Sequence, residues 1–105
     1  MTETHIVFDA AVAAAQDGRR AILATIVRAK GSTPRGVGSR MLIDVERGLV
    51  GTVGGGCGEA QVIEAAKEVL EHGTPQVVRV DLTEDLFSWS PAVCGGIFDV
   101  LIERI

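Results

Sequence analysis

Two glycine-flanked cysteines are the residues of this chain best suited to do chemistry. Cys57 stands in the run Gly-Gly-Gly-Cys-Gly-Glu of residues 54–59, between an apolar strand-like stretch and a strongly periodic helix. Glycines let a backbone approach a ligand closely, and the start of a following helix favours an anion and a thiolate. Cys94 precedes Gly95 and Gly96 where another apolar stretch begins. Both junctions indicate a site, with a buried packing cysteine as the alternative for each.

A basic segment adds a candidate anion-binding element. Residues 28–47 hold five basic side chains and two acidic ones, although the whole chain has a formal net charge of −4. Arg35 lies in the glycine- and proline-punctuated loop 31–38, where its guanidinium is well placed to bind an anion bidentately. A solvated surface loop is the alternative. Glu59, in the first turn of the expected helix, either complements the helix dipole or contacts a ligand.

Other common kinds of site are disfavoured by the spacing of the residues. The chain contains neither a G-x-G-x-x-G dinucleotide fingerprint nor a G-x-x-x-x-G-K-[ST] phosphate loop. Neither cysteine belongs to a C-x-x-C pair, and His5 and His72 lie in no ligand-like spacing. We therefore expect no metal centre. We also expect no catalytic residues of the nucleophile-and-histidine kind, because neither histidine lies near a glycine loop in the sequence.

Length and composition predict one small aliphatic domain. The chain has 105 residues, of which 47% are hydrophobic, with three phenylalanines, one tryptophan and no tyrosine. Its net negative charge argues against binding to nucleic acid or to an anionic membrane. No apolar run reaches the roughly 20 residues that span a bilayer, and the first residues lack the pattern of a signal peptide. We expect a cytoplasmic protein.

The first half of the chain predicts one helix and three strands. Residues 6–17 predict a helix with Phe8, Val12 and Ala15 on its apolar face and Gly18 at its end. Residues 21–27 are apolar on both alternating faces, as in a strand buried on both sides. Two further strands, 40–45 and 49–53, are joined across residues 46–48, whose final glycine is typical of a bulged hairpin.

The second half predicts one helix and two strands. A helix follows Cys57 and ends at His72-Gly73, with its apolar face formed by Val62, Ile63, Ala66, Val69 and Leu70. A strand at 76–82, a polar loop at 81–93 and a strand at 97–105 complete the order α-β-β-β-α-β-β. We expect an α+β (α/β) fold with a mixed sheet packed against two helices. The glycine loops should converge at one edge, with the two cysteines within about 10 Å of each other.

Five ordered motifs give the chain a family resemblance. From about Ala21 to Glu103 it resembles the N-terminal domain of the xanthine dehydrogenase accessory protein family, XdhC/CoxI. The motifs are Ala24-Thr25-Ile26-Val27-Arg28, Gly31-Ser32-Thr33-Pro34-Arg35, Gly38-Ser39-Arg40-Met41, Gly51-Thr52-Val53-Gly54-Gly55-Gly56-Cys57-Gly58-Glu59 and Cys94-Gly95-Gly96. The resemblance implies that residues 1–105 form one XdhC/CoxI-like domain, without the C-terminal Rossmann-like domain of long members.

The resemblance also implies a function and a set of binding residues. Such proteins mature molybdenum hydroxylases of the xanthine or carbon monoxide dehydrogenase type. They transiently bind molybdenum cofactor (molybdopterin), aid its sulfuration with a cysteine desulfurase, and deliver it to the apoenzyme, so we expect a chaperone rather than a turnover enzyme. The implied cofactor-binding residues are Gly31, Ser32, Pro34, Arg35, Arg40, Gly55, Gly56, Cys57, Glu59, Cys94, Gly95 and Gly96.

Three alternatives stay open at this point. The chain could be a scaffolding subunit of a split accessory complex, paired with a separate Rossmann-like subunit. It could instead be a thiol-redox or persulfide-carrying protein that uses Cys57 and Cys94. The glycines could also serve only tight packing in an aliphatic domain. A homo-oligomer is compatible with each of these interpretations.

Overall fold

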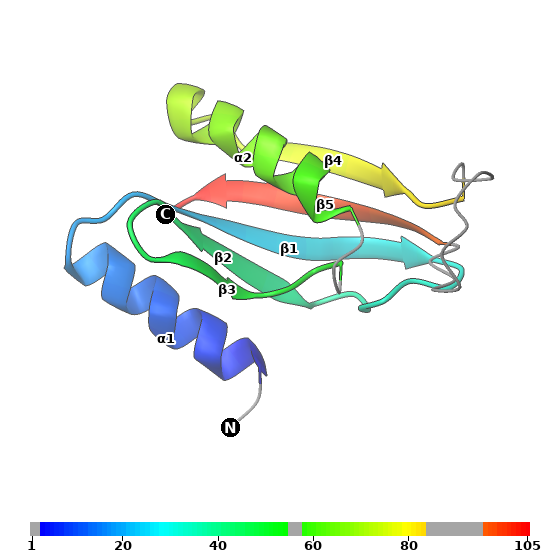
Figure 1. Cartoon of the computed structure of the whole chain (residues 1–105), viewed down its shortest axis with the longest axis horizontal. Coiled ribbons are helices and arrows are strands. Elements are labelled where there is room, and N and C mark those ends of the chain that lie inside the picture. Colours follow the sequence, from blue (N-terminus) through cyan, green and yellow to red (C-terminus); the bar gives the residue numbers. More distant parts are fainter. Residues whose placement is uncertain (1–2, 55–57, 84–95) are drawn as a thin grey trace.

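The computed structural model describes residues 3–54, 58–83 and 96–105. Two helices and five strands follow one another in the expected order (Figure 1). Their bounds are α1 (Glu3–Gln16), β1 (Ala21–Lys30), β2 (Arg40–Asp44), β3 (Gly48–Gly51), α2 (Glu59–His72), β4 (Gln76–Asp81) and β5 (Ile97–Arg104). The predicted α+β class is confirmed. Within these ranges neither helix is long and apolar enough to cross a membrane.

The strands form one sheet in the order β3-β2-β1-β5-β4, and every neighbouring pair is antiparallel. The expected mixed sheet is therefore corrected to a wholly antiparallel one. Short connections reverse the chain between β1 and β2 and between β2 and β3. The long connection through α2 carries the chain from one edge strand, β3, to the other, β4, so the strands that it joins are not neighbours. A parallel pair would require such a crossover to join adjacent strands.

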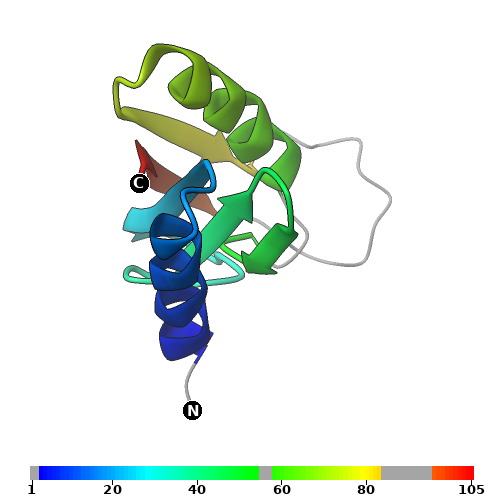
Figure 2. The same cartoon turned by 90° about the vertical axis from the view of Figure 1, so that its left-hand side faces the viewer.

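The sheet lies between the two helices (Figure 2), and a hydrophobic cluster lies on each of its faces. On one face, alternate residues of β1 (Ile22, Ala24 and Ile26) belong to the cluster that includes the buried face of α2. On the other face, Ala21 and Leu23 belong to the cluster that includes α1. The first part of β1 is thus buried from both sides, which confirms the prediction made from its unbroken apolar sequence.

The two helices differ in how well the sequence indicated their buried faces. The predicted face of α2 is confirmed except at Ile63, which is half-buried outside the core cluster, whereas Ala65 is buried in it. The helix ends at Gly73 as predicted. Gly73 has a φ of 77°, and its N–H donates to the Val69 carbonyl at 2.7 Å. The predicted face of α1 is wrong. Phe8 and Val12 are 40% and 55% exposed, and the buried residues are Val7, Ala11 and Ala14.

The neighbouring stripe of α1 is buried because of its small side chains. The sequence of α1, ETHIVFDAAVAAAQ, is so rich in alanine that two adjacent stripes have similar hydrophobicity. The alanine-rich stripe packs with Ala21 and Leu42 in the same cluster, where small side chains permit close approach. Helix α1 also begins at Glu3 rather than at Ile6.

Candidate functional site

Three motif-bearing connections lead to the same end of the sheet. Strands β1, β3 and β4 run in one direction, because each is antiparallel to a neighbour (β2 or β5) that runs the other way. β1 and β4 end level with each other beside Ile97 of β5, so segments 31–39 and 82–96 start together at the end where β1 and β4 point (Figure 1). β3 ends further back, because Gly51 is level with Ala24 of β1, and segment 52–58 reaches this end at Gly58, which packs against Val80. We call this the loop end of the sheet.

Gly96 packs directly against the Gly31–Arg35 loop. A Cβ atom on Gly96 would lie 2.6 Å from Thr33 Cγ2, 2.8 Å from the Lys30 carbonyl oxygen and 2.9 Å from the Ser32 carbonyl carbon. Only glycine permits so close a backbone approach. The Gly96 carbonyl also accepts a hydrogen bond from the Leu82 N–H at 2.9 Å. Two motifs far apart in sequence are thus in contact, as the predicted convergence requires.

Arg35 extends from this loop toward the start of α1. Its guanidinium donates to the Pro34 carbonyl at 3.3 Å, and its Nε lies 3.9 Å from a Glu3 carboxylate oxygen. The Thr33 hydroxyl donates to the Arg35 carbonyl at 2.9 Å and braces the turn. Because the side chain is 43% exposed and its ion pair is long, the guanidinium remains accessible to a ligand.

Arg40 is held more firmly than Arg35. Its guanidinium donates to the Gly38 carbonyl at 2.9 Å, and its Cζ lies 4.8 Å from the centre of the Phe8 ring. That distance permits a cation–π interaction. It also gives Phe8 a contact on the face of α1 that does not enter the core. The sequence analysis missed the contribution of α1 to this end of the sheet, because nothing local in the sequence pairs Phe8 with Arg40.

Thr52 and Glu59 tie together the two ends of the glycine run. The Thr52 hydroxyl donates to the Glu59 carboxylate, at the first residue of α2. Between them, Gly58 has a φ of 76°, and a Cβ there would lie 2.4 Å from Cγ1 of Val80. This glycine is therefore required by packing and by backbone conformation. Glu59 has at least this structural contact, and its role as a ligand contact stays a prediction.

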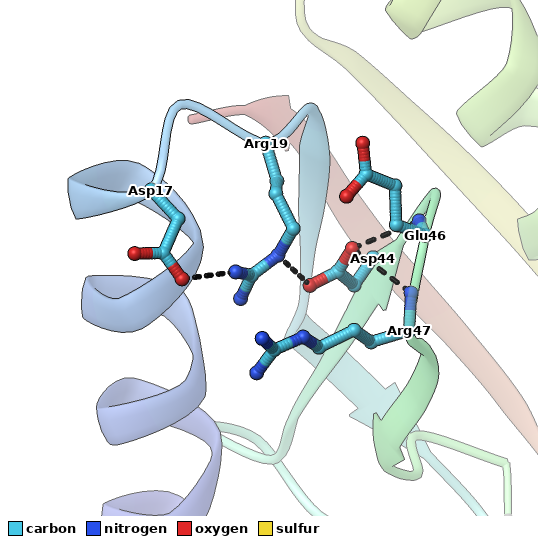
Figure 3. Close-up of polar contacts among 5 residues, drawn as sticks. All are labelled: Asp17, Arg19, Asp44, Glu46 and Arg47. Carbon is cyan, nitrogen blue, oxygen red and sulfur yellow. Dashed lines mark hydrogen bonds and ion pairs between the residues drawn. The ribbon is translucent and has the colours of Figure 1, made fainter.

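A buried ion pair at the opposite end of the sheet was also missed by the sequence analysis (Figure 3). Arg19 Nε lies 2.9 Å from Asp44 Oδ2, with side chains 7% and 3% exposed, and Arg19 also pairs with Asp17. The other Asp44 oxygen accepts the Glu46 and Arg47 N–H groups at 3.0 and 3.2 Å. These contacts join the end of α1 to the β2–β3 turn.

The Asp44 carboxylate is kept ionised by its partners. Desolvation is the largest single influence and raises the pKa, but the Arg19 hydrogen bond and the two backbone N–H groups together outweigh it, so the pKa of Asp44 lies below its ordinary value. Both carboxylate oxygens of Asp44 are engaged within the fold. We therefore assign this cluster to stability rather than to binding.

The predicted site residues divide into two groups. Six of the described ones lie at the loop end of the sheet: Gly31, Ser32, Pro34, Arg35, Glu59 and Gly96. Arg40 lies further back, because it is paired with Thr25 midway along β1. Gly55, Gly56, Cys57, Cys94 and Gly95 lie outside the described residues, so the proximity of the two cysteines stays a prediction. Among the residues that the structure describes, no three His, Cys, Asp or Glu side chains are grouped so as to hold a metal ion.

Relatives of known name share both the sequence and the fold. The chain is 35% identical to a protein of Bacillus subtilis (strain 168) named as a probable subunit of xanthine dehydrogenase, over 100% of this chain and 32% of that protein. It is 31% identical to the molybdenum cofactor insertion chaperone PaoD of Escherichia coli (strain K12), over 100% of this chain and 33% of that protein. A crystal structure described as a xanthine dehydrogenase from Bacillus halodurans superposes with a TM-score of 0.78 at 30% identity, covering 99% of this chain and 30% of that one.

The chain thus spans about a third of the length of these relatives. The sequence profile of one family matches residues 14–81, from the last turn of α1 to the end of β4. That stretch contains the Gly31–Arg35 loop, the glycine run and all of α2. Because this profile matches more than half of the chain and the relatives match its whole length, this protein belongs to the XdhC and CoxI family.

Proposed function

We propose that this domain is an accessory factor for molybdenum hydroxylases of the xanthine or carbon monoxide dehydrogenase type. It transiently binds molybdenum cofactor and assists the sulfuration and insertion of that cofactor, as a chaperone rather than as a turnover enzyme. Membership of the XdhC and CoxI family supports this role. So do the relatives, one named as belonging to xanthine dehydrogenase and another as a molybdenum cofactor insertion chaperone.

The observation that carries the proposal is that three motif-bearing connections meet at the loop end of the sheet. The contact of Gly96 with Ser32 and Thr33 joins two of them directly. The hydrogen bond from Thr52 to Glu59 holds the third beside the start of α2. One small ligand at this end would thus be within reach of all three segments, as in sites formed where connections gather at one edge of a sheet.

The chemistry of the loop-end residues fits the cofactor. Molybdenum cofactor carries an anionic phosphate and a sulfur-rich dithiolene. Arg35 offers an accessible guanidinium for an anion, while Arg40 is fixed beside Phe8 and borders the same loop. Cys57 and Cys94 would supply thiols, and Gly55, Gly56, Gly95 and Gly96 would let the backbone approach the ligand. When bound, the cofactor would supply the redox-active molybdenum that the target enzyme needs.

The partners follow from the same role. A molybdenum hydroxylase apoenzyme would receive the cofactor, and a cysteine desulfurase would supply the sulfur. A separate Rossmann-like subunit would be a further partner. We place these steps in the cytoplasm.

Cofactor retention tests the proposal. The protein would be mixed with free molybdenum cofactor and desalted, then assayed for molybdenum by mass spectrometry and for pterin by fluorescence after oxidation. Stoichiometric retention is expected, with a large loss for Cys57→Ser and little change for Arg47→Ala. Arg47 is a matched control because it lies in the β2–β3 turn, at the end of the sheet away from the loops. If the wild-type protein retained no cofactor, the proposal would fail and a purely scaffolding role would take its place.

A further inference from the structure

A second candidate site lies on the face of the sheet opposite α2. A pocket of about 280 Å³ is lined by Arg28 and Lys30 of β1, Arg79 of β4, and Ile97 and Asp99 of β5. Its volume is at the lower end of the roughly 300–1,000 Å³ of ligand pockets, so it suits a small chemical group rather than a whole cofactor. The pocket adjoins the loop end, because Lys30 precedes Gly31 and Ile97 follows Gly96. Its lining residues are not among those predicted to bind the cofactor.

The register of the strands explains why these side chains meet. Arg28 of β1 is paired with Asp99 of β5, which is paired with Arg79 of β4. The next row on the same face lies two residues later in β1 and β4 and two residues earlier in β5. In that row Lys30 pairs with Ile97, and Ile97 pairs with Asp81. Residues two apart on a strand face the same side of a sheet. The pocket is thus a product of β1–β5–β4 pairing and is built on strands rather than on loops.

Asp99 organises the two arginines. Its side chain is only 12% exposed, and one carboxylate oxygen accepts the Arg79 Nε at 3.1 Å while the other lies 4.0 Å from the Arg28 Nε. Both contacts use the inner nitrogen of a guanidinium. The terminal nitrogens, on side chains 62% and 76% exposed, remain available to a second anion. The Arg79 guanidinium, which this hydrogen bond holds, loses less rotamer entropy when it binds.

The pocket also has more positive than negative charge. It holds three basic side chains and the Asp99 carboxylate, and counting the neighbouring Asp81, which also acts on Arg79, still leaves one positive charge uncompensated. Lys30 lies beside the two arginines on the same face of the sheet. Lys30 and the two arginines thus line one small space, and their side chains are a donor set that matches a tetrahedral oxyanion.

We infer that this pocket binds a phosphate group, either inorganic phosphate or the phosphate of a small phosphate monoester. The inference does not depend on the proposed function, because it rests on Arg28, Lys30 and Arg79 and involves neither the glycine loops nor the cysteines. The terminal guanidinium N–H groups of the two arginines and the Lys30 ammonium donate to the phosphate oxygens. The Asp99 carboxylate orients Arg79 through its hydrogen bond and forms a longer ion pair with Arg28.

Phosphate titration followed by amide chemical shifts tests the inference. Inorganic phosphate is added at constant ionic strength, and saturable shifts are expected at residues 97–99 and at Arg79. Lys30→Ala and Arg79→Ala should each raise the Kd about ten-fold or more, because each loses a charge-assisted contact. Lys67→Ala is the control. Its ammonium pairs with Glu64 on the exposed side of α2, and its loss should leave the Kd unchanged.

A second titration identifies the source of the phosphate, and a charge-conserving variant controls for unfolding. Titration with glycerol phosphate distinguishes the sources, since tighter binding than that of inorganic phosphate indicates a phosphate monoester and equal or weaker binding indicates the free ion. Lys30→Arg keeps the charge and should retain binding even if the alanine variants melt early. Shifts that do not saturate, that map outside the pocket, or that weaken equally in Lys67→Ala would overturn the inference.

Discussion

Replacing Gly58 by alanine should separate a packing glycine from a ligand-binding glycine. Gly58 immediately precedes α2 within the glycine run, and its φ of 76° lies in the left-handed region. A Cβ at this position would lie 2.4 Å from Val80 Cγ1 and 3.7 Å from Phe98 Cζ, both of which are buried side chains. The substitution therefore imposes backbone strain and a steric overlap at once.

The expected cost follows from these two effects. A non-glycine residue in the left-handed region costs roughly 1–2 kcal/mol, and forcing an extra methyl group into a packed core costs roughly 1–3 kcal/mol. Alanine returns about 0.4–1 kcal/mol by restricting the unfolded chain. Gly58→Ala should thus lower the free energy of unfolding by about 3 kcal/mol, a large part of the roughly 5–15 kcal/mol typical of a domain.

Urea denaturation would measure this cost, with Gly18→Ala as the matched control. Gly18 also has a positive φ, 70°, but no atom lies within 4 Å of its added Cβ, so only the backbone cost of about 1 kcal/mol is expected. In a Val80→Ala background the overlap is removed, and the cost of Gly58→Ala should fall to that of Gly18→Ala. If Gly58→Ala cost no more than Gly18→Ala in the wild-type background, the packing role of Gly58 would be refuted.

Three further predictions concern the two ends of the sheet. Cys57→Ser should abolish most cofactor retention without changing the Tm, and a normal retention would make Cys57 a packing residue. Arg35→Ala should lower the affinity for a phosphate-bearing pterin about ten-fold at low salt, with a smaller loss at high salt, whereas an effect equal to that of Arg47→Ala would contradict a direct contact. The pKa of Asp44 is lowered in the folded state, so its carboxylate stabilises the fold above its ordinary pKa of about 3.9, and this stabilisation disappears as the pH falls through the lower folded value. Melting curves of Asp44→Asn and the wild-type protein should therefore differ at neutral pH and approach one another below about pH 4, and a constant difference would argue against the ion pair.

The sequence alone determined the order of the elements and much of the core. The spacing of Val62, Ala66 and Val69 defined α2, since only one stripe of that helix is apolar. Phe98, Val100 and Ile102 alternate along the sequence, and all three are buried on one face of β5. Where two stripes were equally apolar, as in α1, periodicity could not choose between them. The family resemblance was also available from sequence, because the spacing of its motifs is a property of the chain.

Only the tertiary structure decided which distant residues meet. The sheet order places β5 between β1 and β4, and this order brings Arg28, Asp99 and Arg79 into one row. No local pattern encodes strand order, because the free energy of pairing depends on how whole faces pack. The same holds for Gly58 and Gly96, which the sequence presented as parts of ligand loops. Their environments, against Val80 and against the Ser32–Thr33 backbone, exist only after the sheet has formed, since these contacts join segments that are distant along the chain.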